Sequence, residues 1–432
     1  MPVHDRWHLR RSPAPGARKC THRLYPSKEH GVGKRWQVRV LDEDGKPLPK
    51  ENFVFEVDAK NRDTELKAQV QQGTYVSKAA GKVTFEAYST QWRKQRAHGH
   101  STAERVERGL RIHCYEDPDG PKGRTVNDRF AIGGYSMGQL GRRVSLIRDW
   151  ISGLKLEPNA ALLLIGTVEA IFDAAVDDKI IPSNPLRAKS VAKPKRQPTD
   201  VIPWTPEEVE ATCGGLPGRM RAMAYLGAVT GPRQGELFGL AESDIRFLKR
   251  EVHYEVEVIY VGGRLCFAPL KNLRPRTVPI ADNVMPILSR HIERFPPVEV
   301  TLPWSQKGNK RDGELITRKL MFTGNDGRAY YRQTVNRAWQ PAWKAAGVPD
   351  RGRQNGMHVL RHSAATRWLS LGLNPAKVAA FLGDTVGVVV NTYAHWLPDD
   401  DVLGRSIMDS YLSLGAESQS ASDCPTGSLE GI

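Results

Sequence analysis

The chain has 432 residues, of which 40% are hydrophobic and 26% are charged, and its formal net charge is +15. This length exceeds the usual size of a single hydrophobic core, so we expect two or three domains. So large a positive charge indicates a polyanionic partner such as nucleic acid, although a merely soluble, highly charged surface would have the same composition.

The composition argues against several classes of protein. No stretch approaches the roughly 18 apolar residues that a membrane span needs. The basic start, with Arg10 and Arg11, lacks the apolar core of a signal peptide. The cysteines are far apart without a CxxC pair, so we expect no disulfide framework, no zinc site and a reducing cytoplasm. They are Cys20, Cys114, Cys213, Cys266 and Cys424.

The N-terminal 80 residues predict a basic arm and a small domain. Residues 1–33 are polar and basic, and we expect a flexible arm that orders on DNA. Over residues 34–80, Arg35–Val40 alternate as a half-buried strand does, Phe53–Val57 continue a second alternation, and Thr64–Gln72 fit a short helix. This sheet-plus-helix pattern suits a DNA-binding domain, although a charged solvent face would give the same pattern. The candidate DNA contacts are Arg35 and Arg39.

Residues 81–187 have helical patterning and predict a helical domain. Ser101–Glu104 and Ser136–Gln139 are candidate capping boxes, in which side chains satisfy the free amides of a helix start. The apolar run Ala160–Phe172 is expected to form a core helix, and prolines end the block at Pro182 and Pro185.

Residues 188–203 are predicted to be a basic linker. Its prolines remove amide donors, so it cannot join the interior of a helix or sheet. Such a linker would follow the phosphates of a bound duplex; an exposed, solvated connector is the alternative. The candidate DNA contacts are Lys193, Lys195 and Arg196.

A further domain is predicted over residues 204–412. Thr205–Glu208 combine an N-cap, a proline at the first helical position and a capping glutamate. Helical and short strand patterns alternate beyond it, and Asp399–Leu412 resemble an amphipathic helix that could pack on its own domain or on a neighbour. Residues 413–432 are rich in serine and glycine, contain no lysine or arginine, and are predicted to be disordered.

Two segments of this domain carry candidate phosphate-binding cations. In Thr230–Leu237, Arg233 follows a Gly-Pro turn and begins a helix, where a guanidinium can donate two hydrogen bonds to a phosphate. A structural ion pair with Glu236 is the alternative. In Leu270–Ile280 a strand, a basic turn and a strand are expected, with Lys271 at a hairpin tip. A solvated turn lysine would look the same, and Arg276 is a further candidate DNA contact.

Two later segments add titratable groups. On a helix, His358 and Arg361 share one face, so both can address one phosphate, with His362 beside them. Asp384 follows the Gly383 that ends a helix, and Tyr393 lies on the next helical stretch, where a tyrosine would ordinarily be a core residue.

Together, in this order, the four segments resemble the tyrosine recombinase, or phage integrase, family. The family pattern is a TGLRxGEL-type box, a lysine hairpin, HxLRH, then LGH with a tyrosine nine residues on. The Arg35-Trp36 module and the run from Asn391 resemble integrases of actinobacterial phages in particular. Two departures are Pro232, where leucine is usual, and Asp384, where histidine or tryptophan is usual; an ionised carboxylate cannot donate a hydrogen bond to a phosphate.

The resemblance implies a catalytic set and a reaction. Tyr393 would attack a scissile phosphate, form a 3′-phosphotyrosyl link and release a 5′-hydroxyl that then attacks a partner strand. Arg233 and Arg361 would stabilise the phosphate charge and favour the phenolate, His358 would act as general base or hydrogen-bond donor, and Lys271 as general acid. Asp384 would orient His362 or an arginine, or contribute little. The resemblance implies no metal, cofactor or ATP.

It also implies a multidomain α+β fold. That fold has an N-terminal sheet-plus-helix arm-binding domain, a helical core-binding domain, and a mostly helical catalytic domain with a small antiparallel sheet. The partners would be double-stranded DNA at attachment sites, three further copies in a tetramer, and by analogy a host DNA-bending factor and an excision directionality factor. The location would be the bacterial nucleoid.

Two other functions share these features. A topoisomerase of the same chemistry would relax DNA without exchanging partners, but it needs no second sequence-reading domain. A non-catalytic DNA-binding protein descended from an integrase would explain Asp384, but most of the catalytic positions are retained.

Overall fold

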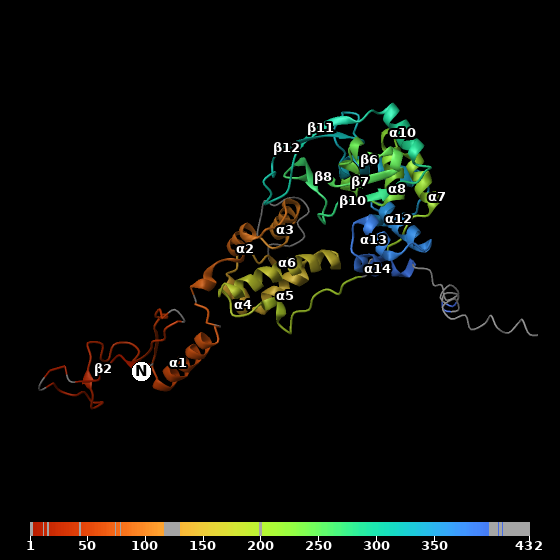
Figure 1. Ribbon diagram of the computed structural model, residues 1–432. Helices are drawn as coiled ribbons and strands as arrows, with labels where there is room; N and C mark the ends of the chain where they lie inside the picture. The colour runs from red at the N-terminus through yellow and green to blue at the C-terminus, as the bar shows by residue number, and fades with distance from the viewer. Residues whose placement is uncertain are drawn as a thin grey trace, which may run out of the picture. The chain divides into compact units, whose positions relative to one another are not determined.

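The computed structural model describes residues 3–11, 13–14, 17–42, 45–73, 75–77, 79–115, 130–197 and 201–396, with Arg405 and Met408 (Figure 1). The chain divides into two compact units. One consists of Met1–His98 and Thr102–Pro198, and the other of Gly99–Ser101 and Thr199–Ile432. The predicted C-terminal helix at Asp399–Leu412, apart from Arg405 and Met408, and the predicted tail lie outside the described residues.

The N-terminal part is a three-stranded antiparallel sheet with one helix. The strands are β1 (Val3–Asp5), β4 (Trp36–Val38) and β5 (Glu51–Phe53), in the order β1-β4-β5, and the helix is α1 (Glu56–Gln71). Ala59 and Leu66 of α1 pack with Val38, Val40 and Leu48 in a core of five buried residues. The sheet and helix expected within residues 34–80 are present, but the second alternation ends at Phe53. Phe55 and Val57 are exposed because the helix begins at Glu56.

The described residues before position 34 differ from the expected flexible arm. β1 pairs with β4, placing Val3 opposite Val38, and β2 (His8–Leu9) pairs with β3 (Tyr25–Pro26). Hydrogen bonds from side chains to the backbone, such as Arg6 Nη1 to Lys34 O at 2.8 Å, hold this polar segment. Polar composition does not reveal bonds of this kind.

A helical bundle follows. It contains η1 (Ala80–Lys82), α2 (Phe85–Gln95), α3 (His100–His113), α4 (Met137–Arg142), α5 (Val144–Gly153), α6 (Pro158–Asp177) and η3 (Pro185–Arg187). Its core includes Phe85, Leu110, Ile147, Trp150 and Phe172. The capping box at Ser136 is present, whereas Ser101 lies inside α3 and is not its start.

The helix α6 is long and apolar enough, by length and composition alone, to cross a membrane. Seven of its residues are buried, and six of these, among them Val168 and Ile171, belong to the bundle core. A core helix of a globular domain passes the same test, so this finding is weak evidence for a membrane span.

The second unit combines helices with small antiparallel sheets (Figure 1). Its α-helices are α7 (Pro206–Gly215), α8 (Gly218–Thr230), α9 (Gln234–Phe238), α10 (Met285–Arg294), α11 (Arg332–Ala345), α12 (Val359–Ser370), α13 (Pro375–Leu382) and α14 (Val386–Tyr393). Its strands are β6 (Ile245–Arg246), β7 (Glu251–Tyr254), β8 (Val256–Val261), β9 (Arg264–Pro269), β10 (Arg276–Pro279), β11 (Val298–Pro303) and β12 (Leu315–Leu320). Its 3-10 helices are η4 (Glu242–Asp244), η5 (Phe247–Lys249), η6 (Gly352–Asn355) and η7 (Ala394–Trp396).

The strands pair as β10-β7-β6, β8-β9 and β11-β12. β9 and β10 therefore flank the predicted basic turn but belong to different sheets, so Lys271 lies on a connection and not on a hairpin tip. The hairpin in this region is instead formed by β8 and β9, which pair directly across the turn at Gly262 and Gly263.

The start of this unit is anchored in its core. The capping box at Thr205 begins α7 as predicted. The ring of Trp204 stacks on Trp339 with 5.5 Å between ring centroids, and the Trp204 backbone N–H donates to Ser363 Oγ at 2.9 Å. Helices α12, α13 and α14 form a separate cluster of buried residues that includes Leu369, Leu382 and Tyr393.

Candidate active site

Arg233 is positioned by a tight reversal between α8 and α9. Gly231 ends α8 in a left-handed conformation with φ +63°. A Cβ atom on Gly231 would lie 2.9 Å from Leu382 Cδ2, so a larger residue would displace that side chain. Arg233 is the N-cap of α9, and its side chain is 20% exposed. The reversal thus leaves one guanidinium at the edge of the core, accessible to solvent.

Glu236 is the fully buried carboxylate that fixes Arg233. It accepts hydrogen bonds from the Arg233 backbone N–H at 2.8 Å and from Arg233 Nη1 at 3.2 Å, and it pairs with Arg276. Burial alone would raise the pKa of Glu236, but the charge of Arg276 and its hydrogen bond hold that pKa below its ordinary value. The structural ion pair that the sequence left as an alternative is present, and it uses only one of the two Nη groups of Arg233.

Arg276 differs from the expected DNA contact. Its side chain is only 6% exposed, and it lies over the Tyr254 ring at 4.9 Å from the guanidinium carbon to the centroid. Its Nε donates to Phe381 O at 2.7 Å. Arg276 therefore joins β10 to α9 and α13 from the interior, and it holds the site together without a surface for a phosphate.

Asp384 bridges the two predicted phosphate-binding arginines. Arg233 Nη2 donates to its Oδ1 and Arg361 Nη2 to its Oδ2, each at 2.5 Å. Arg361 is buried, and its Nη1 also donates to Gly231 O at 2.9 Å. Burial and the like charge of Arg233 lower the pKa of Arg361, and Asp384 opposes that shift. Asp384 thus contacts both arginines, which are among the partners that it was expected to orient.

Tyr393 is buried but not enclosed by apolar atoms alone. Its hydroxyl and His362 Nδ1 are hydrogen-bonded at 2.8 Å. Burial and the charge of Arg361 lower the pKa of His362 to about 4, so the imidazole is neutral near pH 7. Burial raises the pKa of Tyr393 to about 12 and outweighs the attraction of Arg361. The charge of Arg361 favours the phenolate as expected, but in this state burial and the negative charge of Asp384 outweigh it.

His358 lies at the start of α12, with its ring 4.8 Å from that of His362 between centroids. Its ring reaches solvent, but desolvation by the surrounding protein and the charges of His362 and Arg361 lower the pKa of His358. A neutral His358 beside two arginines can accept a proton or a hydrogen bond at the same site.

Lys271 is exposed on the connection between β9 and β10. Its neighbour Asn272 donates from Nδ2 to Gly383 O at 2.7 Å, which fixes this connection beside the Asp384 segment. Burial and the charge of Glu236 raise the pKa of Glu257 to about 7, and the charge of Lys271 opposes this rise. Lys271 therefore lies near enough to the buried carboxylates of the site to influence them.

The remaining candidate DNA-contact residues differ in whether their charges are paired within the protein. Arg35 is paired with Asp5 at 2.8 Å and stacks over Trp36, so its charge is partly used within the protein. Arg39 is exposed and donates to Gln37 Oε1 at 2.7 Å. In the predicted linker, Lys193 pairs with Glu169 at 2.7 Å, whereas Lys195 and Arg196 are exposed.

Two contacts of the site were not predicted from the sequence. The hydrogen bond between His362 and Tyr393 joins residues 31 apart, and the contact of Arg276 with Glu236 joins residues 40 apart. His362 was visible only as a neighbour of Arg361 on the same helix. For Arg276 the available signal was its strand position next to a basic turn, which does not distinguish an interior cation from a surface one.

Comparison with known proteins finds similar sequences and folds. Residues 207–399 match the model of the phage integrase family. A tyrosine recombinase XerC-like protein of Caldanaerobacter subterraneus subsp. tengcongensis is 26% identical over 251 residues, covering 54% of this chain and 61% of that protein. The integrase of Mycobacterium phage L5 is 27% identical, covering 41% of this chain and 49% of that protein. The chain thus spans about half to three fifths of the length of these curated relatives.

Solved structures show the same fold at low identity. The Tn1549 transposon integrase, in complex with a circular intermediate DNA, aligns with a TM-score of 0.57 at 18% identity, covering 74% of this chain and 98% of that one. A lambda integrase dimer bound to a core site aligns with a TM-score of 0.51 at 15% identity, covering 74% and 97%. The fold is that of the tyrosine recombinases, with mixed helices and small antiparallel sheets. Segment 207–399 of this chain is thus similar to the phage integrase family, and the rest of the chain lies outside that match.

Proposed function

We propose that this protein is a site-specific DNA recombinase that cuts and rejoins strands through a 3′-phosphotyrosyl link to Tyr393, integrating or excising phage or mobile-element DNA. The observation that carries the proposal is the convergence of Arg233 and Arg361 on one anion, 2.5 Å from each, although 128 positions separate them. A carboxylate held in this way marks a place where two guanidinium groups can hold the oxygens of a phosphate.

In the proposed reaction the DNA phosphate takes the place of Asp384 between the two arginines. The Tyr393 oxygen attacks phosphorus while its proton passes to a neutral imidazole, His362 or His358. The bond from phosphorus to the 5′-oxygen breaks, and Lys271 protonates the leaving oxygen. Rejoining reverses these steps with a 5′-hydroxyl of the partner strand as nucleophile. Asp384 then acts by holding the arginines before DNA binds, and it has no contact with the phosphate itself.

The proposal extends to the other parts of the chain. The sheet-plus-helix module within residues 34–80 would bind arm-type sites, and the helical bundle would bind core sites. The basic linker would contact the phosphates between them. Strands β1 to β5 and helix α1 together form the N-terminal module, and a hollow of about 310 Å³ in it supports this role, because four cationic side chains are among its lining. They are Arg6, Lys28, Arg39 and Lys50. The active form would be a tetramer, and a lambda integrase tetramer bound to a Holliday junction shares the fold. It would act in the bacterial cytoplasm with a host DNA-bending factor and an excision directionality factor.

Covalent capture tests the proposal without knowledge of the attachment site. Purified protein is incubated with a library of nicked duplexes of random sequence, denatured, and separated from free DNA. We expect the wild-type protein to retain DNA of a common sequence and Tyr393→Phe to retain none. Tyr260→Phe is the matched control, because Tyr260 is an exposed tyrosine in the same unit.

Each alternative has its own outcome in the same experiment. If wild type and Tyr393→Phe bind DNA equally and neither retains it after denaturation, the protein is a DNA-binding module and the proposal is wrong. If the captured DNA supports relaxation of supercoils but no exchange between two copies of the captured sequence, the protein is a topoisomerase.

A further inference from the structure

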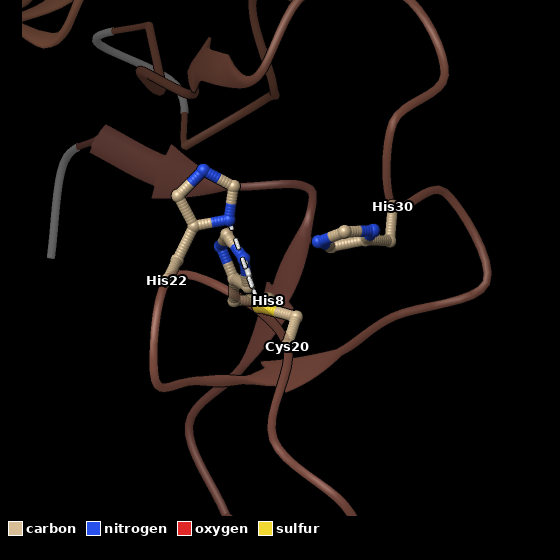
Figure 2. Close-up of side chains that lie close together, drawn as sticks. All are labelled: His8, Cys20, His22 and His30. Atoms are coloured by element: carbon tan, nitrogen blue, oxygen red, sulfur yellow. Dashed lines mark hydrogen bonds between the residues drawn. The ribbon is translucent and has the colours of Figure 1, made fainter.

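Four potential metal ligands meet in the N-terminal module, far along the chain from the candidate active site. They are His8, Cys20, His22 and His30. Their ligand atoms all lie within 4.8 Å of one another. Figure 2 shows the three imidazole rings gathered around the Cys20 sulfur. His8 lies on β2, and the other three come from the chain before and after β3.

The distances fit a tetrahedral ion better than a set of hydrogen bonds. Bonds of about 2.0–2.3 Å from zinc to nitrogen and sulfur place neighbouring ligands roughly 3.3–3.6 Å apart. Cys20 Sγ is 3.2 Å from His8 Nε2 and 3.6 Å from His22 Nδ1. One thiol can donate to only one of these two nitrogens and can only weakly accept from the other, whereas a thiolate and two imidazoles can bind one cation together.

Asp5 supplies the outer contact that metal-bound histidines usually have. His8 Nδ1 is 2.8 Å from Asp5 Oδ2, which leaves Nε2 of the same ring to face the sulfur. Asp5 is itself held by Arg35 and by the Trp7 backbone N–H at 3.0 Å. A carboxylate that fixes the tautomer and orientation of a ligating imidazole is the arrangement found around protein-bound zinc.

His30 gives an independent indication. Its Nε2 is buried and, among the described residues, has no hydrogen-bond partner. A buried polar atom without a partner costs about 1–3 kcal/mol, and coordination to a cation would satisfy it. Its ring centroid is 5.1 Å from that of His8 and 5.9 Å from that of His22.

The module has a physical need for such an ion. Its described core consists of five buried residues, and small domains with little apolar core commonly depend on a structural metal. Between β1 and β4, the described part of the segment that holds the four ligands has only the two-residue strands β2 and β3. One ion would join both sides of this segment and so fix the approach of β1 to β4.

We propose that His8, Cys20, His22 and His30 form a structural Zn²⁺ site that stabilises the N-terminal module. Thiolate sulfur and imidazole nitrogen are ligands that Zn²⁺ prefers, and four of them complete a tetrahedral site with no position left for a substrate. The sequence expectation of no zinc site is replaced by this proposal. That expectation looked for cysteine pairs, whereas here histidines spread over residues 8–30 supply three of the four ligands.

The test is metal content of the full-length protein. After growth with zinc and dialysis against a weak chelator, mass spectrometry of the metal should find about one zinc per chain in the wild type. Cys20→Ser and His30→Ala should each reduce this to about a tenth, while His22→Cys, which keeps a ligand, should retain it. The matched control is His253→Asn, a histidine that lies on β7 in the other unit.

Two further measurements keep the outcome clear. Cobalt added to stripped wild type should give the strong visible bands of a tetrahedral thiolate site, and Cys20→Ser should lose their sulfur-dependent component. Stripping should also make residues before Trp36 sensitive to protease, and zinc should restore protection. The proposal is wrong if the wild type holds no zinc after reconstitution, or if Cys20→Ser and His30→Ala hold as much as the control. Covalent capture through Tyr393 does not enter these results, so each proposal can fail alone.

Discussion

At the scale of single residues, Asp384 determines the resting state of the candidate site. Its two oxygens each accept a hydrogen bond from a different arginine. Two guanidinium groups this close repel each other, and one carboxylate relieves the repulsion. Under the proposed function, an incoming phosphate would displace this internal anion, and the free protein should bind small anions poorly at this place.

Replacing Asp384 should reveal the anion site. Asp384→Asn removes the charge at nearly constant volume, so we expect a loss of about 1–3 kcal/mol in the free energy of unfolding. Sulfate should restore part of this loss, because it can occupy the space between the freed arginines. Thermal unfolding with increasing sulfate measures both effects, and Asp326→Asn, at an exposed carboxylate, controls for general salt effects. Equal sulfate responses in wild type and Asp384→Asn would contradict the interpretation.

The lowered pKa values of His358 and His362 predict how the stability of the protein depends on pH. The pKa of His362 is lowered to about 4 in the folded protein, against an ordinary value of 6.5. Between these values the unfolded chain binds more protons, so this contribution to stability is present above pH 6.5 and is lost as the pH falls towards 4. In His362→Asn the decrease of melting temperature between pH 6.5 and 5 should be shallower than in the wild type. A parallel decrease in both proteins would show that His362 is not desolvated.

At the scale of elements, the site is assembled from the ends of helices and from connections. α8 ends at Gly231, α9 begins after Arg233, and α13 ends at Gly383 just before Asp384. Helix ends were readable from the sequence, because glycine, proline and capping residues mark them. Which ends meet was not readable, because Arg276 and Glu236, or Tyr393 and His362, come together only through tertiary packing.

The connection that carries Lys271 was also predictable in its local structure but not in its tertiary contacts. The sequence predicted a basic turn between two strands, and strands do flank it. It did not predict that they pair with different neighbours, because strand pairing depends on long-range register. It also did not indicate the hydrogen bond from Asn272 to Gly383, which sets where Lys271 lies.

Removing that hydrogen bond should affect chemistry more than binding. In Asn272→Ala, Lys271 would lose its fixed position, and we expect covalent capture to slow by roughly tenfold or more, within the range that a displaced general acid costs. DNA affinity should change less than twofold, because no phosphate contact is assigned to Asn272. Capture rates and binding isotherms on the same DNA provide the comparison. Equal losses in rate and affinity would indicate that the connection binds DNA and does not position an acid.

At the scale of the whole molecule, the charge of +15 was the earliest indication of function and the least specific. Several of the basic residues that the sequence assigned to DNA are engaged within the protein, Arg276 most completely and Lys193 through Glu169. Charge can be counted from a sequence, but burial and pairing cannot. The same limit concealed the cluster of His8 and Cys20, since its ligands follow no compact spacing.

The remaining exposed cations predict a steep dependence on salt. Binding to any duplex should weaken with a log–log slope of about −0.9 for each phosphate neutralised. Lys195→Ala should reduce the magnitude of this slope by about one contact if the linker follows the phosphates. Arg276→Lys should leave the slope unchanged. Fluorescence anisotropy from 50 to about 300 mM salt measures the slopes, and a flat response in the wild type would contradict binding led by phosphate contacts.

The anchoring of Trp204 has a mechanical consequence. Ser363, which accepts the Trp204 backbone N–H, lies on the same helix as Arg361 and His362. Strain that enters through the preceding connector thus reaches a peptide group joined directly to the helix that carries both of these residues. A force transmitted along the chain would therefore act first on α12, which carries Arg361 and His362, through the single hydrogen bond to the Ser363 hydroxyl.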